Sequence, residues 1–348
     1  MKLRLINLAL FIICFLSINT PEILGDDADI KVSTSLHGEA YLQHSFRKNA
    51  EKLPEYMVSH VELNSPAVNL LLGKIAFDAK SWKGEFSMMS GTYSRDNLAH
   101  EIGILKNINS MWLSYAPSET IDILAGIYSS HIGVESPIGK ECLVPTRSIV
   151  ADNSPYYESG IRIRHQSNNA IYAIHLLNGW QRSSIDSLGI LPAIGYEYSA
   201  NTEQLNYRFS GFIGKISHDT SDGMRYYQHL GATYQINPNF IVSASLDIGL
   251  QQKKEIQAWM IAPLIMGQWS LNESLKAHGR LEYYHDPEGM IISSMSGLAG
   301  FGYSLGIDWS YSNAMLFRAE WRQIHAMHDN QDVNILGIHA QWAIINEL

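Results

Sequence analysis

Cysteine is nearly absent from this chain, which has two cysteines, Cys14 and Cys142, in 348 residues. Cys14 lies in an N-terminal segment, residues 1–25, that has the layout of a secretory signal peptide: two cations, a short apolar run and a more polar end. Cleavage after this segment leaves Cys142 alone. An internal disulfide is then excluded, and an exported chain of this size must gain its stability in another way.

Long apolar runs are also absent. After the N-terminal segment, no window approaches the roughly 18 consecutive apolar residues that indicate a transmembrane helix. Charged residues make up 17% of the chain, and its mean hydropathy is close to neutral. The wall of a membrane barrel has this profile, because lipid-facing and lumen-facing residues cancel in a running average. We expect residues 26–348 to form a single domain without a transmembrane helix.

The chain also has no excess of basic over acidic residues. The net charge of −9 argues against nucleic acid as a partner and against a cationic surface helix. No G-x-S-x-G or HExxH motif is present. The tightest histidine pair, His325 and His328, lies in a predicted loop without the helical context that would aim both rings at one ion. The chain is therefore expected to be no enzyme and to hold no cofactor and no metal.

A strict period of two is what the sequence does contain. In segment 301–311, aromatic and aliphatic residues occupy the odd positions, and glycine, serine and aspartate the even ones. Successive side chains of a strand point to opposite faces, so one face is apolar and the other small and polar. Soluble strands usually end after about 5–6 residues, whereas a tilted transmembrane strand needs ~9–11. The segment is long enough to span a bilayer.

The alternation recurs in segments along the chain, and turns and loops separate these segments at regular intervals. Short polar turns such as 237–239 and 312–313 alternate with longer connections such as 128–155 and 251–256. Seven short turns and eight longer loops separate sixteen strand candidates, of which those near 66–79 and 259–269 alternate poorly. This layout predicts a closed antiparallel transmembrane β-barrel of about 16 strands, with 14 or 12 as alternatives. The last strand must pair with the first, because lipid leaves an open edge unsatisfied.

The predicted inward faces carry charge of both signs. Opposed charges in a barrel can select permeating solutes, or they can pair across strands and hold the wall together. Reversal of Arg318 and Arg322 to glutamate is expected to shift the selectivity toward cations if the first interpretation holds. The predicted pore-lining residues are Glu158, Arg162, Arg164, Arg208, Lys276, Arg280, Glu282, Asp308, Arg318, Glu320 and Arg322.

The connection 128–155 is the longest within the predicted barrel. A loop of more than about 12–15 residues usually has a function or is disordered. We expect this loop to fold into the lumen and narrow the pore, and the alternative is a loop that only caps the outer rim. Its candidate constriction residues are His131, Glu135, Lys140, Glu141, Arg147 and Asp152.

Segment 126–180 resembles the OmpL-like β-barrel porin family of Bacteroidetes. The resemblance rests on a glycine at a strand end, a Gly-x-Glu in the next loop, an Arg-Ser, a Pro-Tyr-Tyr and an Asn-Gly-Trp, in this order. Cys142 stands where the family would have a polar residue, and the chain ends without a terminal aromatic residue. The matching residues include Gly126, Gly133, Glu135, Arg147, Asn178, Gly179 and Trp180.

This resemblance implies an integral outer-membrane channel. We expect a porin through which small hydrophilic solutes or ions diffuse passively, with its apolar faces against outer-membrane lipid and a homotrimer as one expected assembly. A non-conducting barrel that acts as an adhesin or wall component through its loops is the second hypothesis. An integral hydrolase, with a serine and a histidine side by side on the outer face, and a soluble exported β-protein are the others.

Overall fold

The computed structural model describes residues 30–48, 50–184, 192–216, 222–253, 255–292, 297–327 and 332–347. The predicted signal peptide and His328 lie outside these residues. Within them, no helix combines the length and the apolar character needed to cross a membrane.

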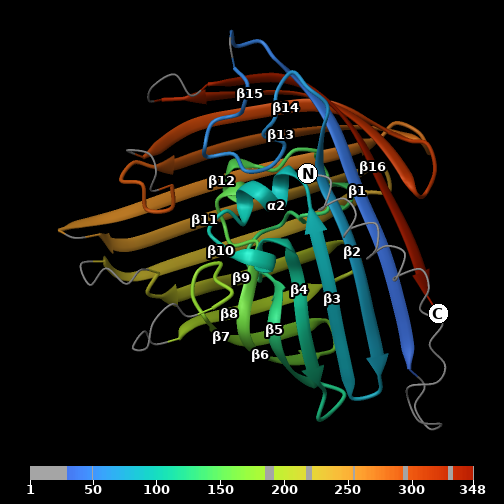
Figure 1. The fold of residues 1–348 in the computed structure, drawn as a ribbon, viewed down its shortest axis with the longest axis vertical. Helices are drawn as coiled ribbons and strands as arrows, with labels where there is room; N and C mark the ends of the chain where they lie inside the picture. The colour runs from blue at the N-terminus through green and yellow to red at the C-terminus, as the bar shows by residue number, and fades with distance from the viewer. Residues whose placement is uncertain are drawn as a thin grey trace.

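Sixteen antiparallel strands form one closed barrel, and each strand pairs with its neighbours in sequence (Figure 1). The prediction of sixteen strands is confirmed, and the alternatives of 14 and 12 are wrong. The strands are β1 (Lys31–Ser45), β2 (Ala67–Ala79), β3 (Trp82–Ser90), β4 (Ile108–Tyr115), β5 (Ile121–Ser129), β6 (Tyr157–Ser167), β7 (Ala170–Leu177), β8 (Ala193–Asn201), β9 (Leu205–Gly214), β10 (Asp222–Asn237), β11 (Phe240–Lys253), β12 (Ile256–Ser270), β13 (Leu275–Asp286), β14 (Leu298–Ser310), β15 (Met315–Ala326) and β16 (Val333–Glu347).

The barrel closes through its first and last strands. β1 and β16 pair continuously from Ser33 opposite Glu347 to Ser45 opposite Ile335. This seam leaves no strand edge among the sixteen, so the backbone groups of the wall bond to one another. The closure that a lipid environment demands is met.

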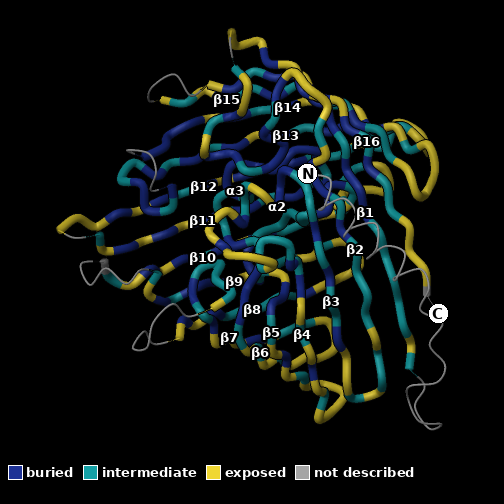
Figure 2. The backbone as a smooth tube through the Cα atoms, viewed as in Figure 1, coloured by how far each residue is buried: buried dark blue, intermediate teal, exposed yellow. Residues whose placement is uncertain are grey.

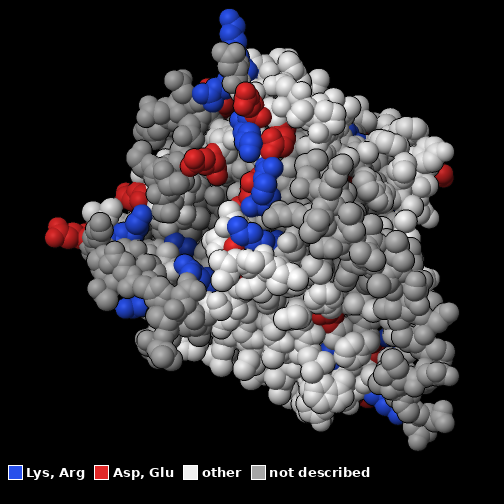
Figure 3. Space-filling model, viewed as in Figure 1, with Lys and Arg blue, Asp and Glu red and all other residues white. Residues whose placement is uncertain are grey.

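Outward and inward side chains alternate along the wall as the period of two predicts. On β14, Leu305 and Trp309 face outward and are 63% and 48% exposed, whereas Ser304 and Asp308 face inward and are 1% exposed. Figure 2 shows this alternation of buried and exposed positions along many strands. On the face drawn in Figure 3, many of the described charged side chains lie in a band near the upper centre, smaller groups lie toward the left and lower right, and much of the other described surface is uncharged. Such a wall can face lipid.

One feature of the strand pattern differs from expectation, and a second, the poor alternation expected near 259–269, has a structural cause. The connection predicted at 251–256 is tight, because β11 runs to Lys253 and β12 begins at Ile256. β12 alternates poorly because both of its faces are apolar: Met260 and Leu264 point inward and are buried, while Trp259 points outward. The inner apolar face has a partner inside the barrel.

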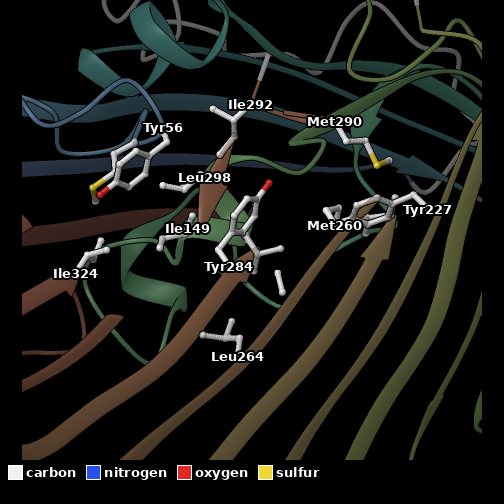
Figure 4. Close-up of a cluster of buried hydrophobic side chains, with 14 of the residues drawn as sticks. Tyr56, Ile149, Tyr227, Met260, Leu264, Tyr284, Met290, Ile292, Leu298 and Ile324 are labelled. Carbon is white, nitrogen blue, oxygen red and sulfur yellow. The ribbon is translucent and has the colours of Figure 1, made fainter. Parts of the chain in front are cut away.

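That partner consists of long loops that fold into the bore. The loop between β1 and β2, the loop between β5 and β6, and the loop between β13 and β14 contribute Tyr56, Ile149 and Met290 to one apolar cluster (Figure 4). Inward residues of the wall, including Met260 and Tyr284, complete it. Short helices lie in the loop between β3 and β4, α2 (Thr92–Asn97) and η1 (Gly103–Asn107), and in the loop between β5 and β6, η2 (Gly139–Glu141) and α3 (Ile149–Asp152).

The small face of β14 makes room for inward side chains. A Cβ on Gly302 would lie 2.8 Å from Glu282 Cγ, and a Cβ on Gly306 would lie 2.3 Å from His278 Cε1 and 2.2 Å from the Ala319 carbonyl oxygen. Gly302 and Gly306 therefore leave the space that the inward side chains of β13 occupy.

We predict that Gly306→Ala destabilises the barrel by about 1–3 kcal/mol, the usual cost of overpacking. Gly267→Ala is the matched control, because a Cβ at that position meets its nearest neighbour, Phe240, at an ordinary 3.4 Å. Urea midpoints of the refolded barrels, followed by the heat-dependent gel shift, measure the difference. Equal midpoints for the two variants would show that β14 tolerates larger side chains.

Candidate functional site

The loop between β5 and β6, residues 130–156, is called the inserted loop below. It braces itself with its own side chains: Glu135 accepts hydrogen bonds from the backbone N–H of Ser148 at 3.2 Å and from the Ser148 hydroxyl. Arg147, buried, donates to the carbonyl oxygens of Pro145 and Pro137 at 3.1 Å each. These bonds hold the two arms of the loop together, as in compact loops packed by their own side chains.

The first arm of the inserted loop crosses to β9. The ring of His131 lies 2.9 Å from the Gly211 carbonyl oxygen, and the Ser210 hydroxyl donates to the His131 carbonyl at 2.7 Å. Arg208 donates to the carbonyl oxygen of Gly133 at 3.2 Å. The loop therefore leaves the wall between β5 and β6 and enters the lumen, as predicted. The alternative of a loop that only caps the rim is wrong.

Arg318 of β15 holds the middle of the loop on the opposite wall. Its guanidinium donates to the carbonyl oxygens of Gly139 and Cys142 at 3.0 Å and of Leu143 at 2.8 Å. Asp308 of β14 accepts the two remaining bonds, at 2.7 and 2.8 Å. All five N–H donors of an arginine are thereby used.

The second arm of the loop is held by charges on β13 and β15. Arg280 donates to the Thr146 carbonyl at 2.7 Å, and Glu320 accepts from the Thr146 hydroxyl at 2.7 Å. Glu282 accepts from the backbone N–H of Ile149 at 2.6 Å and from Arg322 at 2.7 Å. The six residues that hold the loop are called the latch: Arg280, Glu282, Asp308, Arg318, Glu320 and Arg322.

The latch is a buried, neutral cluster of three cations and three anions. Its members are between 0% and 4% exposed. Removal of charges from water is costly, and a buried pair is tolerated only where hydrogen bonds satisfy the remaining donors and acceptors. The backbone of the inserted loop supplies those bonds. The latch and the loop therefore depend on each other.

All eleven predicted pore-lining residues point into the barrel, but their exposure divides them. Glu158 and the six latch residues are buried, so the expectation that the whole set lines water has to be corrected. Alternation reveals the face of a strand but not the loop that covers it. The residues that stay partly exposed are Arg162, Arg164, Arg208 and Lys276.

The exposed inward charges form ion pairs in which the cation is the more exposed partner. Arg164 lies 2.6 Å from Asp122, with side-chain exposures of 35% and 13%. Arg208 lies 3.3 Å from Glu197, with exposures of 37% and 12%. Lys74 and Glu85, 3.3 Å apart, repeat the asymmetry near β2 and β3 with 33% and 17%. Lys74, Glu85 and Asp122 were not predicted, although Asp122 lies in a segment, 121–127, that alternates clearly.

The remaining constriction residues have separate roles. Lys140 donates to the Asn313 carbonyl in the short turn between β14 and β15, so the loop reaches the end of the barrel that carries the short turns. Glu141 is exposed, and its carboxylate accepts from the Ser136 hydroxyl at 2.6 Å. The Cys142 thiol donates to the Ser136 carbonyl at 3.2 Å, and thus serves where a polar residue was expected.

Asp152 joins the inserted loop to the loop between β1 and β2. The Ser59 hydroxyl donates to its carboxylate at 2.6 Å. Burial raises the pKa of Asp152 from its usual 3.8 to about 6. Because the folded pKa lies above the unfolded one, this group favours the folded loop fully below pH 3.8, and that contribution is lost as the pH rises through about 6.

The residues that carried the family resemblance shape the backbone around the loop. Gly126, Gly133 and Gly179 have positive φ, and a Cβ on Gly126 would lie 2.1 Å from the Met111 carbonyl oxygen. Asn178 donates to the Ser183 carbonyl at 3.0 Å. Trp180 packs against Phe212 of β9 with ring centroids 5.1 Å apart. These positions fix how the chain enters and leaves the strands.

Comparison with known proteins agrees with this architecture. Residues 30–341 match the family model described as putative beta-barrel porin-2, OmpL-like. A search of curated proteins finds no match.

Solved structures with the same fold are porins and other outer-membrane proteins. Salmonella typhi OmpF in complex with daunomycin aligns with a TM-score of 0.62 and 11% identity over 90% of this chain and 97% of that one. The trimer form of OmpT from Vibrio cholerae gives 0.59 and 9% over 92% and 100%. An anion-selective porin from Comamonas acidovorans gives 0.56 and 9% over 92% and 100%.

We predict that Arg318→Met releases the inserted loop. The substitution leaves Asp308 and three carbonyl groups without their hydrogen-bond donor in a buried site, where loss of one partner of an ion pair costs roughly 3–5 kcal/mol. Limited proteolysis should then cut within 130–156, and the urea midpoint should fall. Arg164→Met is the control, because exposed pairs contribute ~0–1 kcal/mol. An equal effect of both substitutions would mean that the latch does not hold the loop.

Proposed function

The chain belongs to the putative beta-barrel porin-2, OmpL-like family, and we propose that this outer-membrane porin is a passive diffusion channel that prefers small anions and anionic hydrophilic solutes. The observation that supports the preference is the asymmetry of the exposed inward pairs. In the pairs of Arg164, Arg208 and Lys74, the cation is about two to three times as exposed as its carboxylate.

The proposed conducting path runs along the wall formed by β6 to β9, on the side of the bore away from the latch. There Arg162 and Arg164 of β6 and Arg208 of β9 keep contact with solvent. The latch wall, β13 to β15, lies beneath the inserted loop and is excluded from the path by its burial. A solute on this path meets more positive than negative charge, since these arginines are more exposed than the carboxylates they pair with.

Diffusion needs no covalent chemistry, and this supports a channel over a hydrolase. Among the described residues, Ser35 and His37 form a serine–histidine hydrogen bond of 3.1 Å. Both side chains point into the bore from β1, whereas a lipid hydrolase needs such a pair on the outer face. The chemistry of this site therefore favours transport.

An adhesin or wall component remains the second candidate. A cluster of charge in the loops, with Arg95 2.8 Å from Glu62 and Lys52 3.5 Å from the same carboxylate, is the feature that favours it. A purified barrel that folds but carries no current would support this candidate and contradict the channel.

Reversal of the exposed arginines tests the selectivity. The double variant Arg164→Glu and Arg208→Glu should shift the reversal potential in a salt gradient toward cations, with the anion-to-cation permeability ratio falling about fivefold for a change on the order of 1 kcal/mol. Arg95→Glu, on α2 in the loop between β3 and β4, is the control and should leave the ratio unchanged. Reversal of Arg318 and Arg322 does not test the ion selectivity, because both residues belong to the buried latch.

The result that contradicts the anion preference is an unchanged ratio in the double variant with an intact heat-dependent gel shift. A fall of the same size in the ratio with Arg95→Glu would place the selectivity in the loop between β3 and β4 and contradict the proposed path.

Two further expectations also stay proposals. Cleavage after residue 25 is tested by sequencing the N-terminus of the exported protein. Assembly as a homotrimer is tested by the mass of the protein in detergent, and the monomer mass would contradict it.

A further inference from the structure

We propose that Glu39, His60 and His339 form a binding site for a transition-metal ion of the zinc class. Their ligand atoms all lie within 4.8 Å of one another. Glu39 belongs to β1, His339 to β16 and His60 to the loop between β1 and β2. The three residues come from distant parts of the sequence and meet at the seam that closes the barrel.

One ligand pair has the spacing of a first coordination shell, and the third ligand would move inward to complete it. At metal–ligand distances of ~2.0–2.2 Å, neighbouring ligands of a tetrahedral ion lie roughly 3.3 Å apart. His60 Nε2 lies 3.0 Å from Glu39 Oε1, yet the contact lacks hydrogen-bond geometry. Two ligands of one ion approach each other in this way.

The histidine nitrogens lack other partners. Both ring nitrogens of His60 and both of His339 are buried without a hydrogen bond to any described residue. The residues themselves are 0% and 3% exposed. Buried polar atoms are nearly always bonded, and His60 Nδ1 and both nitrogens of His339 have not even the contact with Glu39 that His60 Nε2 has, so the cluster requires an explanation. A metal ion would satisfy one nitrogen of each ring.

Neighbouring residues hold the ligands in place. Asn69 donates to Glu39 Oε2 at 2.9 Å and accepts from the His60 backbone N–H at 3.0 Å. Gln341 donates to Glu39 Oε1. The ring of Tyr41 lies edge-on to His60, with centroids 5.0 Å apart. Such outer contacts orient metal ligands and are part of a working site.

The backbone at His60 is also unusual. Its φ is 53°, in the left-handed region that non-glycine residues seldom adopt. Strained backbone persists where the surroundings hold it, and it is frequent at ligand sites. The His60 ring lies beside that of His339 of the seam, with ring centroids 4.9 Å apart.

The donor set selects the class of ion. Two imidazoles and one carboxylate match the three protein ligands of known zinc sites, and imidazole favours zinc, copper and nickel over magnesium and calcium. A bound ion would pin the loop between β1 and β2 to both strands of the seam. This role concerns the stability of the barrel, so it does not depend on the proposed anion preference.

Zinc titration of the refolded, chelator-treated full barrel tests the site. We expect one zinc ion per barrel by calorimetry and by metal analysis, and no competition from magnesium. His60→Gln and His339→Gln should weaken binding by at least ~100-fold, the upper range for loss of a mere outer contact. His44→Gln is the matched control, because His44 lies on β1, is exposed and points away from the cluster. Absence of stoichiometric zinc on the folded wild-type barrel would overturn the proposal.

A spectroscopic measurement covers the case in which a variant fails to fold. Cobalt added to the wild-type barrel should give the intense visible absorption of a tetrahedral nitrogen and oxygen site, and zinc should displace it. Chelation should lower the unfolding temperature of the wild type and of His44→Gln. A cobalt spectrum like that of the aqueous ion, or zinc binding unchanged in His339→Gln, would contradict the assignment.

Discussion

The structure depends on the mutual satisfaction of buried charge and loop backbone. Arg318 alone donates five hydrogen bonds, three to the inserted loop and two to Asp308. Without the loop, the latch would be a patch of charge in a wet lumen. Without the latch, the loop carbonyls would lose their donors inside the barrel. The loop and the latch each supply the hydrogen bonds that offset the desolvation cost of the other's buried polar groups.

This pairing divides the bore into two unlike halves. On the latch side, loop and wall form a packed interior in which Met260, Tyr284 and Ile149 belong to one apolar cluster. On the side of β6 to β9, the arginines keep contact with solvent and are more exposed than the carboxylates they pair with. A barrel can thus be rigid and permeable at once, because rigidity and permeation use different arcs of its wall.

The sequence predicts the wall well and the interior poorly. Strict alternation, as on β14, identifies both the strand and its inward face, and the turn rhythm leads to sixteen strands. On β12 the inner face packs against an apolar part of the loops inside the bore and is itself apolar, so the alternation is lost there. Burial of Arg322 and Glu282 follows from a loop more than a hundred residues earlier in the chain, so no local pattern reveals it. The meeting of His60 with His339 has the same origin, since only closure of the barrel brings the last strand to the first.

Accessibility of single cysteines to a water-soluble thiol reagent, read out as channel current, tests the division of the bore directly. In a Cys142→Ser background, Ser199→Cys on β8 faces the proposed path and is partly exposed, whereas Ser304→Cys lies between latch residues and is 1% exposed. Modification at position 199 should reduce the current, and position 304 should not react in the folded barrel. Equal reaction at both positions, or a block from position 304 alone, would contradict a loop held on the latch wall.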